Sequence, residues 1–283
     1  MLDQAGRAGP YPGPAGQPGS TAIHMDDPNI IAWADGWRDY QVGSHCESAW
    51  QTPQLALGKA AGTPFDIVSL GRGGMITLIF PLGIGDREGF DFLVFENSVN
   101  DTFLELAYVE VSSDGIHFFR FDNDSLTASP VPSYGAVDPT NITGLAGKYR
   151  QGYGTPFDLN ELKGISPLLD VTGVHYVRLV DIIGDGTCLD TSGDIIYDPY
   201  PTIGSAGFDL EAVGVLNTCN ADFDGSGAVD LLDLLIFANA WLTGLVDPNW
   251  DSRCDLSYDK DDWINYGDFV VFSKQWQTEA AAE

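Results

Sequence analysis

Basic residues are scarce in this chain, which has 13 lysines and arginines against 41 aspartates and glutamates. The net charge of −28 leaves no basic stripe to neutralise phosphates, so the composition argues against nucleic-acid binding. An anionic membrane surface would repel the chain as well. No apolar run has the length of a transmembrane helix, so we expect no membrane insertion. Such an acidic chain suits a calcium-rich medium outside the cell.

Residues typical of catalytic sites are also few. The four histidines do not stand in a zinc-protease spacing, and neither a nucleophile elbow nor a phosphate-binding loop occurs. Acidic residues are spread along the whole chain, so no carboxylate pair stands out for glycoside hydrolysis. We therefore expect a non-catalytic protein and assign no catalytic residues.

One acidic stretch, residues 222–233, has the spacing of a twelve-residue calcium loop of EF-hand type. Calcium takes six to eight oxygen ligands, and four carboxylates this close would repel each other without a cation. A solvated acidic turn is the alternative. The expected ligands are the side chains of Asp222, Asp224, Ser226, Asp230 and Asp233 and the backbone carbonyl of Ala228, with Gly227 at the sharp turn.

A second copy of this pattern follows at an offset of 35 residues, which pairs Asp233 with Asp268 and Trp241 with Trp276. Ser257 replaces aspartate at the first loop position and Asp262 replaces glycine at the sixth, so we expect weaker calcium binding. Asp255 would supply the missing carboxylate if the loop were longer. The expected ligands of the second loop are Ser257, Asp259, Asp261, Trp263, Asn265 and Asp268.

An amphipathic segment follows each loop, and no comparable helix precedes either, so the unit is loop–helix. Helical spacing predicts that Leu232 is exposed and Phe237 partly exposed. The predicted buried stripes are Leu231, Leu234, Leu235, Ala238 and Trp241 in the first copy, and Tyr266, Phe269, Val270, Ser273 and Trp276 in the second.

Residues 219–277 resemble a dockerin domain, in which two calcium loop–helix repeats plug into a cohesin partner. The resemblance implies Ca²⁺ as cofactor and a cohesin-like protein or cell-surface scaffold as partner. It also implies that loop positions 10 and 11 and the following helix contact that partner. Leu232 and Phe237 are the candidate contact residues in the first repeat. The two copies differ at these positions, which predicts a single binding orientation.

The chain has four cysteines, Cys46, Cys188, Cys219 and Cys254. Four cysteines allow three connectivities, so spacing alone does not decide the pairing. Cys219 and Cys254 precede the two loops at equivalent places, and a disulfide there would clamp a small domain. We therefore prefer the pair Cys219–Cys254, which leaves Cys46–Cys188.

Residues 21–217 have a β-like pattern of short apolar runs separated by Gly, Pro, Asn and Asp. Residues 106–112 alternate, with Ala107, Val109 and Val111 on one face. Ser113 to Gly115 then predicts a tight hairpin. Many short strands indicate a mainly β, antiparallel sandwich. The expected strands are 67–70, 75–80, 90–96, 106–112, 116–121, 176–182 and 208–216.

The runs 73–80, 95–97, 109–115 and 207–213 resemble the strands of a galactose-binding-like jelly roll found in bacterial cell-surface proteins of the planctomycete type. The resemblance implies a domain that binds a glycan or another surface ligand. Jelly rolls of this type often hold a structural calcium, for which the candidates are Glu96, Asn97 and Asp101, with Glu105 close by in the same loop. Candidate sugar-stacking aromatics are Trp33, Trp37, Tyr40 and Trp50, or the loop tyrosines Tyr149, Tyr153, Tyr197 and Tyr200.

The expected organisation is a flexible Pro/Gly-rich arm at 1–20, the sandwich at 21–217, the calcium module at 218–277 and a tail at 278–283. No signal peptide is visible, and we expect a leader to be missing from this sequence. The preferred function is a secreted, non-catalytic cell-surface or extracellular protein with a calcium-binding attachment module. The alternatives are a polysaccharide-degrading glycosyl hydrolase that carries a dockerin, and a structural adhesin with a calcium-stabilised cap.

Overall fold

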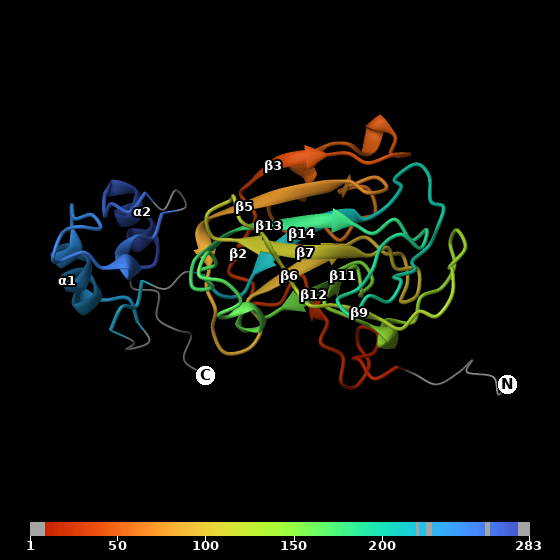
Figure 1. Cartoon of the computed structure of the whole chain (residues 1–283), viewed down its shortest axis with the longest axis horizontal. Coiled ribbons are helices and arrows are strands. Elements are labelled where there is room, and N and C mark those ends of the chain that lie inside the picture. Colours follow the sequence, from red (N-terminus) through yellow and green to blue (C-terminus); the bar gives the residue numbers. More distant parts are fainter. Residues whose placement is uncertain (1–8, 219–220, 225–227, 258–260, 277–283) are drawn as a thin grey trace.

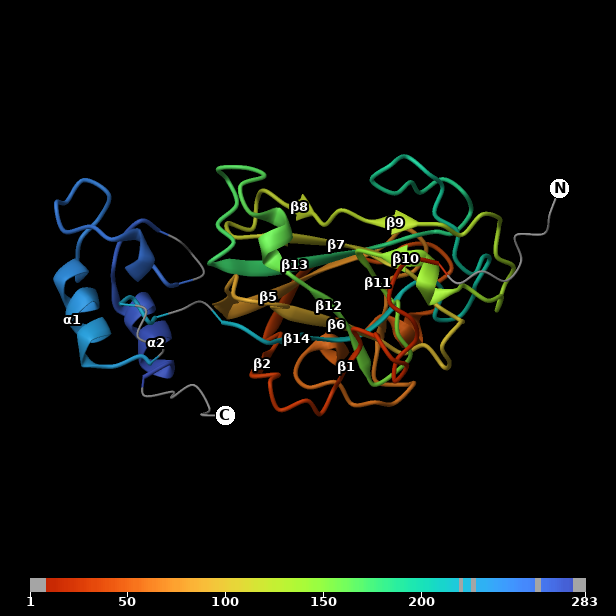
Figure 2. The ribbon, with the colours of Figure 1, turned by 90° about the horizontal axis from the view of Figure 1, so that it is seen from below.

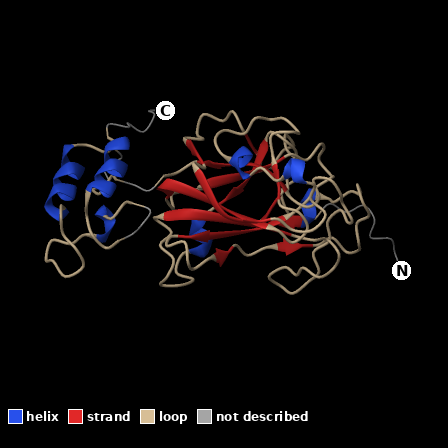
Figure 3. Cartoon of the chain, turned by 90° about the horizontal axis from the view of Figure 1, so that it is seen from above, coloured by secondary structure: helices blue, strands red, loops and turns tan. Residues whose placement is uncertain are grey.

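The computed structural model describes residues 9–218, 221–224, 228–257 and 261–276. Figure 1 shows a large β-structured part followed by a small part that contains the helices α1 (Leu231–Ala240) and α2 (Tyr266–Lys274). Figure 3 shows the strands grouped in the large part. The prediction of a mainly β, antiparallel fold is confirmed.

Two antiparallel sheets form the large part, and Figure 2 shows them edge-on. The first has the strand order β1 (Ile23–His24), β12 (Tyr153–Phe157), β6 (Phe92–Glu96), β14 (Asp209–Val215) and β2 (Ala32–Trp33), and β4 (Val68–Ser69) also pairs with β14. The second has the order β11 (Leu145–Ala146), β7 (Ala107–Ser112), β13 (Val174–Asp181), β5 (Met75–Ile84) and β3 (Gly36–Gln41), with β8 (Phe119–Arg120) beside β7.

Smaller elements lie in the connections. They are the strand pair β9 (Asp124–Ser125) and β10 (Ile142–Thr143) and the 3₁₀ helices η1 (Ser48–Trp50), η2 (Pro53–Ala56), η3 (Pro139–Asn141), η4 (Leu159–Leu162) and η5 (Ser252–Cys254).

The main hydrophobic core lies between the two sheets. Phe92 and Val94 of the first sheet share it with Leu78 and Val177 of the second. The predicted alternation in β7 is confirmed, because Ala107, Val109 and Val111 all belong to this core. Burial of this continuous apolar area is the main stabilising term of the sandwich.

The predicted hairpin after β7 is present, but residues 113–118 connect its strands, so the turn is longer than the tight turn predicted at Ser113 to Gly115. Val111 pairs with Phe119, and the turn between them contains Gly115 at a φ of 72°, a backbone conformation that favours glycine. Asp114 fixes the turn, because its Oδ1 accepts the backbone N–H groups of Ile116 and His117, each at 2.8 Å. β8 is shorter than the predicted strand 116–121.

The Pro/Gly-rich segment 9–16 is not a free arm, as we expected for residues 1–20, but lies against the sandwich. The backbone N–H of Tyr11 donates to the carbonyl of Thr140 at 3.1 Å, and Ala15 is 3% exposed. The carbonyl of Ala15 accepts a hydrogen bond from Arg150 at 3.0 Å. Composition predicted flexibility here, but backbone hydrogen bonds to distant segments hold the stretch in place.

The two helices of the small part pack through aromatic rings. Phe237 of α1 and Phe272 of α2 are 5.1 Å apart between ring centroids, and both are 1% exposed. Leu82 of β5 also packs against this cluster, so the small part contacts the sandwich. A cavity of about 510 Å³ between them is lined by Asp170 of the sandwich and Asp222 of the small part. In the described part of the chain, no helix has the length and hydrophobicity needed to span a bilayer.

The buried faces of both helices differ from the predicted stripes. Leu231 and Leu235 are 71% and 67% exposed, whereas Phe237, predicted to be partly exposed, is buried. α1 instead buries Asp233, Phe237 and Ala240, and α2 buries Asp268, Val271 and Phe272. Most residues of α1 are apolar, so hydrophobic spacing alone did not define its phase.

Candidate metal centre

The first predicted loop brings three of its carboxylates together. Asp222, Asp224 and Asp233 each offer an oxygen, and these oxygens lie within 4.8 Å of one another. Calcium–oxygen distances are about 2.3–2.6 Å, so two ligands on opposite sides of one ion are about 5 Å apart. The three oxygens therefore fit a single calcium ion. The predicted ligand Ser226 lies outside the described residues.

Asp233 also closes the first loop through backbone hydrogen bonds. The side chain is fully buried, and its Oδ1 accepts the N–H groups of Phe223 at 2.6 Å and Asp224 at 3.1 Å. Its Oδ2 accepts the N–H of Asp230 at 2.9 Å. Asp230 is the N-cap of α1, where its Oδ1 accepts the N–H of Leu232 at 2.8 Å. These bonds orient the loop carboxylates at the helix N-terminus, where negative charge is favourable.

The second repeat has the same network around Asp268. This buried carboxylate accepts the N–H groups of Leu256 and Ser257 at 2.7 and 2.8 Å through Oδ1, and of Asn265 at 2.8 Å through Oδ2. Leu256 therefore occupies the place of Phe223 in the first repeat, and both belong to the same core cluster. Phe223 lies 10 residues before Asp233, whereas Leu256 lies 12 before Asp268.

The second loop is thus two residues longer than the first, as the difference between 12 and 10 shows. Asp255 takes the place of Asp222, and Ser257 takes that of Asp224. Ser257 therefore does not lie at the first loop position, and Asp255 lies there, as we expected for a longer loop. The constant offset concealed this shift because the extra residues lie between Ser257 and Asp262. Asp262 has a φ of 56°, as a residue replacing the turn glycine requires.

The other predicted ligands of the second loop are only partly defined. Asp259 lies outside the described residues. Asp261 accepts the side-chain amide of Asn265 at 3.0 Å and the backbone N–H of Trp263 at 3.1 Å. The carbonyl of Trp263 also accepts the amide of Asn265, at 3.1 Å. Among the described residues of this loop, no three acidic side chains converge as they do in the first.

The residues predicted to hold a calcium in the sandwich point to different partners. Asp101 forms an ion pair with Arg150 at 2.6 Å. The amide of Asn97 donates to the carbonyl of Pro64 at 3.3 Å, and Glu96 is buried at the end of β6. The trio of Glu96, Asn97 and Asp101 is therefore not assembled into one site.

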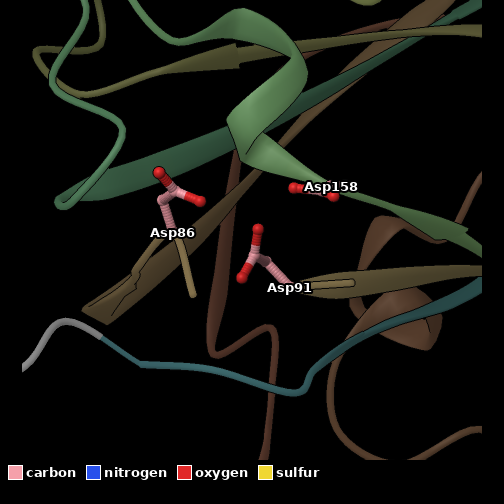
Figure 4. Close-up of side chains that lie close together, drawn as sticks. All are labelled: Asp86, Asp91 and Asp158. Carbon is pink, nitrogen blue, oxygen red and sulfur yellow. The ribbon is translucent and has the colours of Figure 1, made fainter. Parts of the chain in front are cut away.

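A second acidic group with metal-like spacing was not predicted from the sequence. Asp86, Asp91 and Asp158 offer oxygens within 4.8 Å of one another, and Figure 4 shows how these side chains lie. Nearby protein groups already bind the carboxylate oxygens of these residues. Asp86 pairs with Lys163 at 3.0 Å, and Asp158 is the N-cap of η4.

Asp91 is the buried member of this group and ties three segments together. It accepts the N–H groups of Arg87 and Leu159, at 3.0 and 2.8 Å, and the amide of Asn217 at 2.9 Å. Burial raises the pKa of Asp91, and these hydrogen bonds oppose the shift. Because protein groups already satisfy these carboxylates, we assign the group a structural role.

The predicted disulfides are not supported. Cys46 and Cys188 are both free thiols with different surroundings: the Cys46 sulfur lies 3.9 Å from the carbonyl of Ser69, and Cys188 packs in a separate cluster with Ile182 and Ile196. Cys254 is a buried free thiol whose pKa burial raises to about 12. Its expected partner, Cys219, lies outside the described residues.

The candidate sugar-stacking aromatics do not form one platform. Trp37 and Tyr40 pack against the main core, and Trp33 packs on Phe95 with 5.4 Å between ring centroids. Tyr149 is 1% exposed, so it is not an exposed loop residue as we expected. Trp50 instead stacks on the exposed side chain of Phe65, at 6.4 Å between centroids.

An exposed apolar ridge lies beside the first loop and was only partly predicted. We define the ridge as Leu231, Leu232 and Leu235 of α1. Leu232 is 57% exposed, as predicted, and Leu231 and Leu235 are more exposed still. The ridge faces solvent because the inward position of Asp233 turns these leucines outward.

Comparison with known proteins adds no assignment: no protein-family model matches the chain, and no curated protein is similar to it at a significant level.

Proposed function

We propose that residues 218–277 form a calcium-dependent docking module that attaches the β-sandwich to a protein partner outside the cell. The observation that carries the proposal is the convergence of Asp222, Asp224 and Asp233 at the N-terminus of a helix that exposes apolar side chains. When bound, calcium would neutralise the three carboxylates and hold the loop against the N-terminus of α1. The resemblance to dockerins makes a cohesin-like protein the expected partner.

The ridge is the expected contact surface. Three adjacent exposed leucines on one short helix exceed the scattered apolar residues of an ordinary surface. The equivalent positions of Leu231 and Leu232 in the second repeat are Tyr266 and Gly267, so the repeats do not present the same surface. This difference supports one binding orientation through the first repeat. Phe237, the other candidate contact, is buried between the helices and would act only by supporting the ridge.

The decisive experiment measures binding of the full chain to immobilised recombinant cohesin modules, in calcium and in EGTA. We expect capture in calcium and none in EGTA. Leu232→Asp should lower the affinity about fivefold or more, as loss of a contact worth over about 1 kcal/mol predicts. Leu245→Asp is the matched control, because Leu245 is 62% exposed but lies between the repeats, off the ridge. Equal capture by wild type and Leu232→Asp would reject the ridge.

The sandwich would contribute a ligand-binding surface, for which we propose a glycan or another cell-surface ligand. The stacked pair of Trp50 and exposed Phe65 supports this role, because aromatic faces stack on sugar rings. Affinity electrophoresis in polysaccharide gels would test it, with Phe65→Ala expected to abolish retardation. Release of reducing sugar by the purified chain would instead favour the glycosyl hydrolase. No calcium-dependent capture by any cohesin would favour a structural adhesin whose repeats only stabilise the chain.

A further inference from the structure

Five carboxylates are buried together inside the sandwich, apart from the calcium loops. Each is at most 5% exposed. Among the described residues, no lysine, arginine or histidine forms an ion pair with any of them. A buried charge without a partner is strongly unfavourable, so this cluster needs compensation. The five are Glu96, Glu105, Asp181, Asp198 and Asp209, which we name the buried acidic centre.

The backbone brings these residues to one place. Glu96 ends β6 and pairs with Leu210, the residue after Asp209. Asp198 accepts the N–H of Leu106, the residue after Glu105, at 3.0 Å. The centre therefore lies at the N-terminal end of β14. The calcium module follows the C-terminal end of this strand.

Asp181 joins the same place from the other sheet. It ends β13, and its Oδ1 accepts the N–H of Phe208, the residue before Asp209, at 2.7 Å. Its Oδ2 accepts the N–H of Gly73 at 2.7 Å. Both oxygens of Asp181 thus have backbone donors, so its role in the centre is to hold the strands in position.

Two carboxylate oxygens at the centre have no hydrogen-bond partner among the described residues. They are Oε1 of Glu105 and Oδ1 of Asp209, which belong to side chains 5% and 3% exposed. Nearly all buried polar atoms in folded proteins have a partner, so two such oxygens beside other carboxylates indicate a missing positive group. Burial and the neighbouring Asp209 and Glu96 raise the pKa of Glu105 well above its usual value.

We propose that the buried acidic centre binds a divalent cation, with Glu105 and Asp209 as ligands and Glu96 and Asp198 completing the negative charge around it. No three of these carboxylates offer oxygens within 4.8 Å of one another, so we assign only Glu105 and Asp209 as direct ligands. We expect Ca²⁺, because it accepts six to eight oxygen ligands in flexible geometry, including hydroxyls and water, whereas Mg²⁺ requires a near-ideal octahedron. A single divalent ion would neutralise two carboxylates without requiring their protonation.

Hydrogen–deuterium exchange of the full chain, with calcium alone as the probe, tests the proposal. Calcium at about ten times its dissociation constant should slow exchange about tenfold around Leu106 and Phe208, which report on the centre. Segment 221–233 reports separately on the first calcium loop. The double variant Glu105→Gln with Asp209→Asn should lose the protection around Leu106 and Phe208 but keep that of segment 221–233.

Asp91→Asn is the matched control, because Asp91 is equally buried but its carboxylate has three protein donors. It should keep the calcium protection at the centre. If the double variant fails to fold, hydrogen–deuterium exchange of the wild-type chain with and without calcium still tests the proposal. Calcium protection confined to segment 221–233 would overturn the proposal, as would protection of the centre by lowered pH but not by calcium. Equal protection by Mg²⁺ at the same concentration would overturn the preference for calcium.

Discussion

The sandwich and the small C-terminal module that contains α1 and α2 are stabilised in different ways. The sandwich buries one continuous core between two sheets, whereas the module has a small cluster centred on Phe237 and Phe272. The module compensates with two fully buried carboxylates, Asp233 and Asp268, each of which accepts three backbone N–H groups. A small domain can thus replace missing apolar area with side-chain hydrogen bonds, but its stability then depends on few residues.

Removing one of these carboxylates should have the largest effect. Asp233→Ala leaves three backbone N–H groups without an acceptor, each costing about 1–3 kcal/mol, so the module should lose at least about 3 kcal/mol. The sandwich should be unaffected. Urea unfolding followed by far-UV circular dichroism, in saturating calcium so that the wild-type module is folded, measures both.

Asp230→Ala is the graded control. The Asp230 side chain caps α1 by accepting the N–H groups of Leu232 and Asp233, and loss of such a cap should cost about 1 kcal/mol. If Asp233→Ala is no more destabilising than Asp230→Ala, the network around Asp233 does not hold the module together.

Calcium removal should have the next largest effect. Helices of 10 and 9 residues are too short to persist alone. Calcium at a hundred times its dissociation constant would contribute about 2.7 kcal/mol to the module. EGTA should therefore abolish the helical circular dichroism while the β signal stays, because the core of the sandwich keeps it folded. An unchanged helical signal in EGTA would contradict calcium-dependent folding.

The smallest predicted effect lies in the sandwich, at the hairpin residue Asp114. Partial burial would raise the pKa of Asp114, but hydrogen bonds from the side chain and backbone of His117 and from Ile116 and Ser112 outweigh it and lower the pKa to about 2. Since the folded pKa lies below the unfolded value, this stabilisation is present above about pH 4 and is lost as the pH falls towards 2.

Asp114 is 35% exposed, so solvent screening reduces its contribution to about 1 kcal/mol. Asp114→Asn should therefore cost about 1 kcal/mol at pH 7 and almost nothing at pH 2, as measured by urea unfolding at both values. The same cost at both pH values would show that the carboxylate charge is not responsible.

Local patterns in the sequence predicted much of this structure. Alternation identified the core face of β7, and Ser113 to Gly115 identified the hairpin turn. The spacing of residues 222–233 identified three carboxylates that the structure brings together. These features depend on residues close in sequence, whose relative positions the backbone geometry of a strand, a turn or a short loop already determines.

Features that depend on distant segments could not be predicted in this way. Hydrophobic spacing misplaced the buried face of α1, because the backbone N–H groups that donate to the Asp233 carboxylate decide which face turns inward. The sequence left two lengths open for the second loop, and the hydrogen bonds from the backbone N–H groups of Leu256 and Ser257 to Asp268 decide for the longer one.

By itself, the sequence determined the β-rich class, the acidic surface and the loop–helix repeat, because composition and short-range periodicity carry that information. Only the tertiary structure decided which carboxylates meet. Glu96 and Glu105 lie in one predicted loop cluster, but no local pattern distinguishes Asp181, Asp198 and Asp209 among the 41 acidic residues of the chain. They come together because strand pairing and backbone hydrogen bonds join their segments at one end of the sandwich.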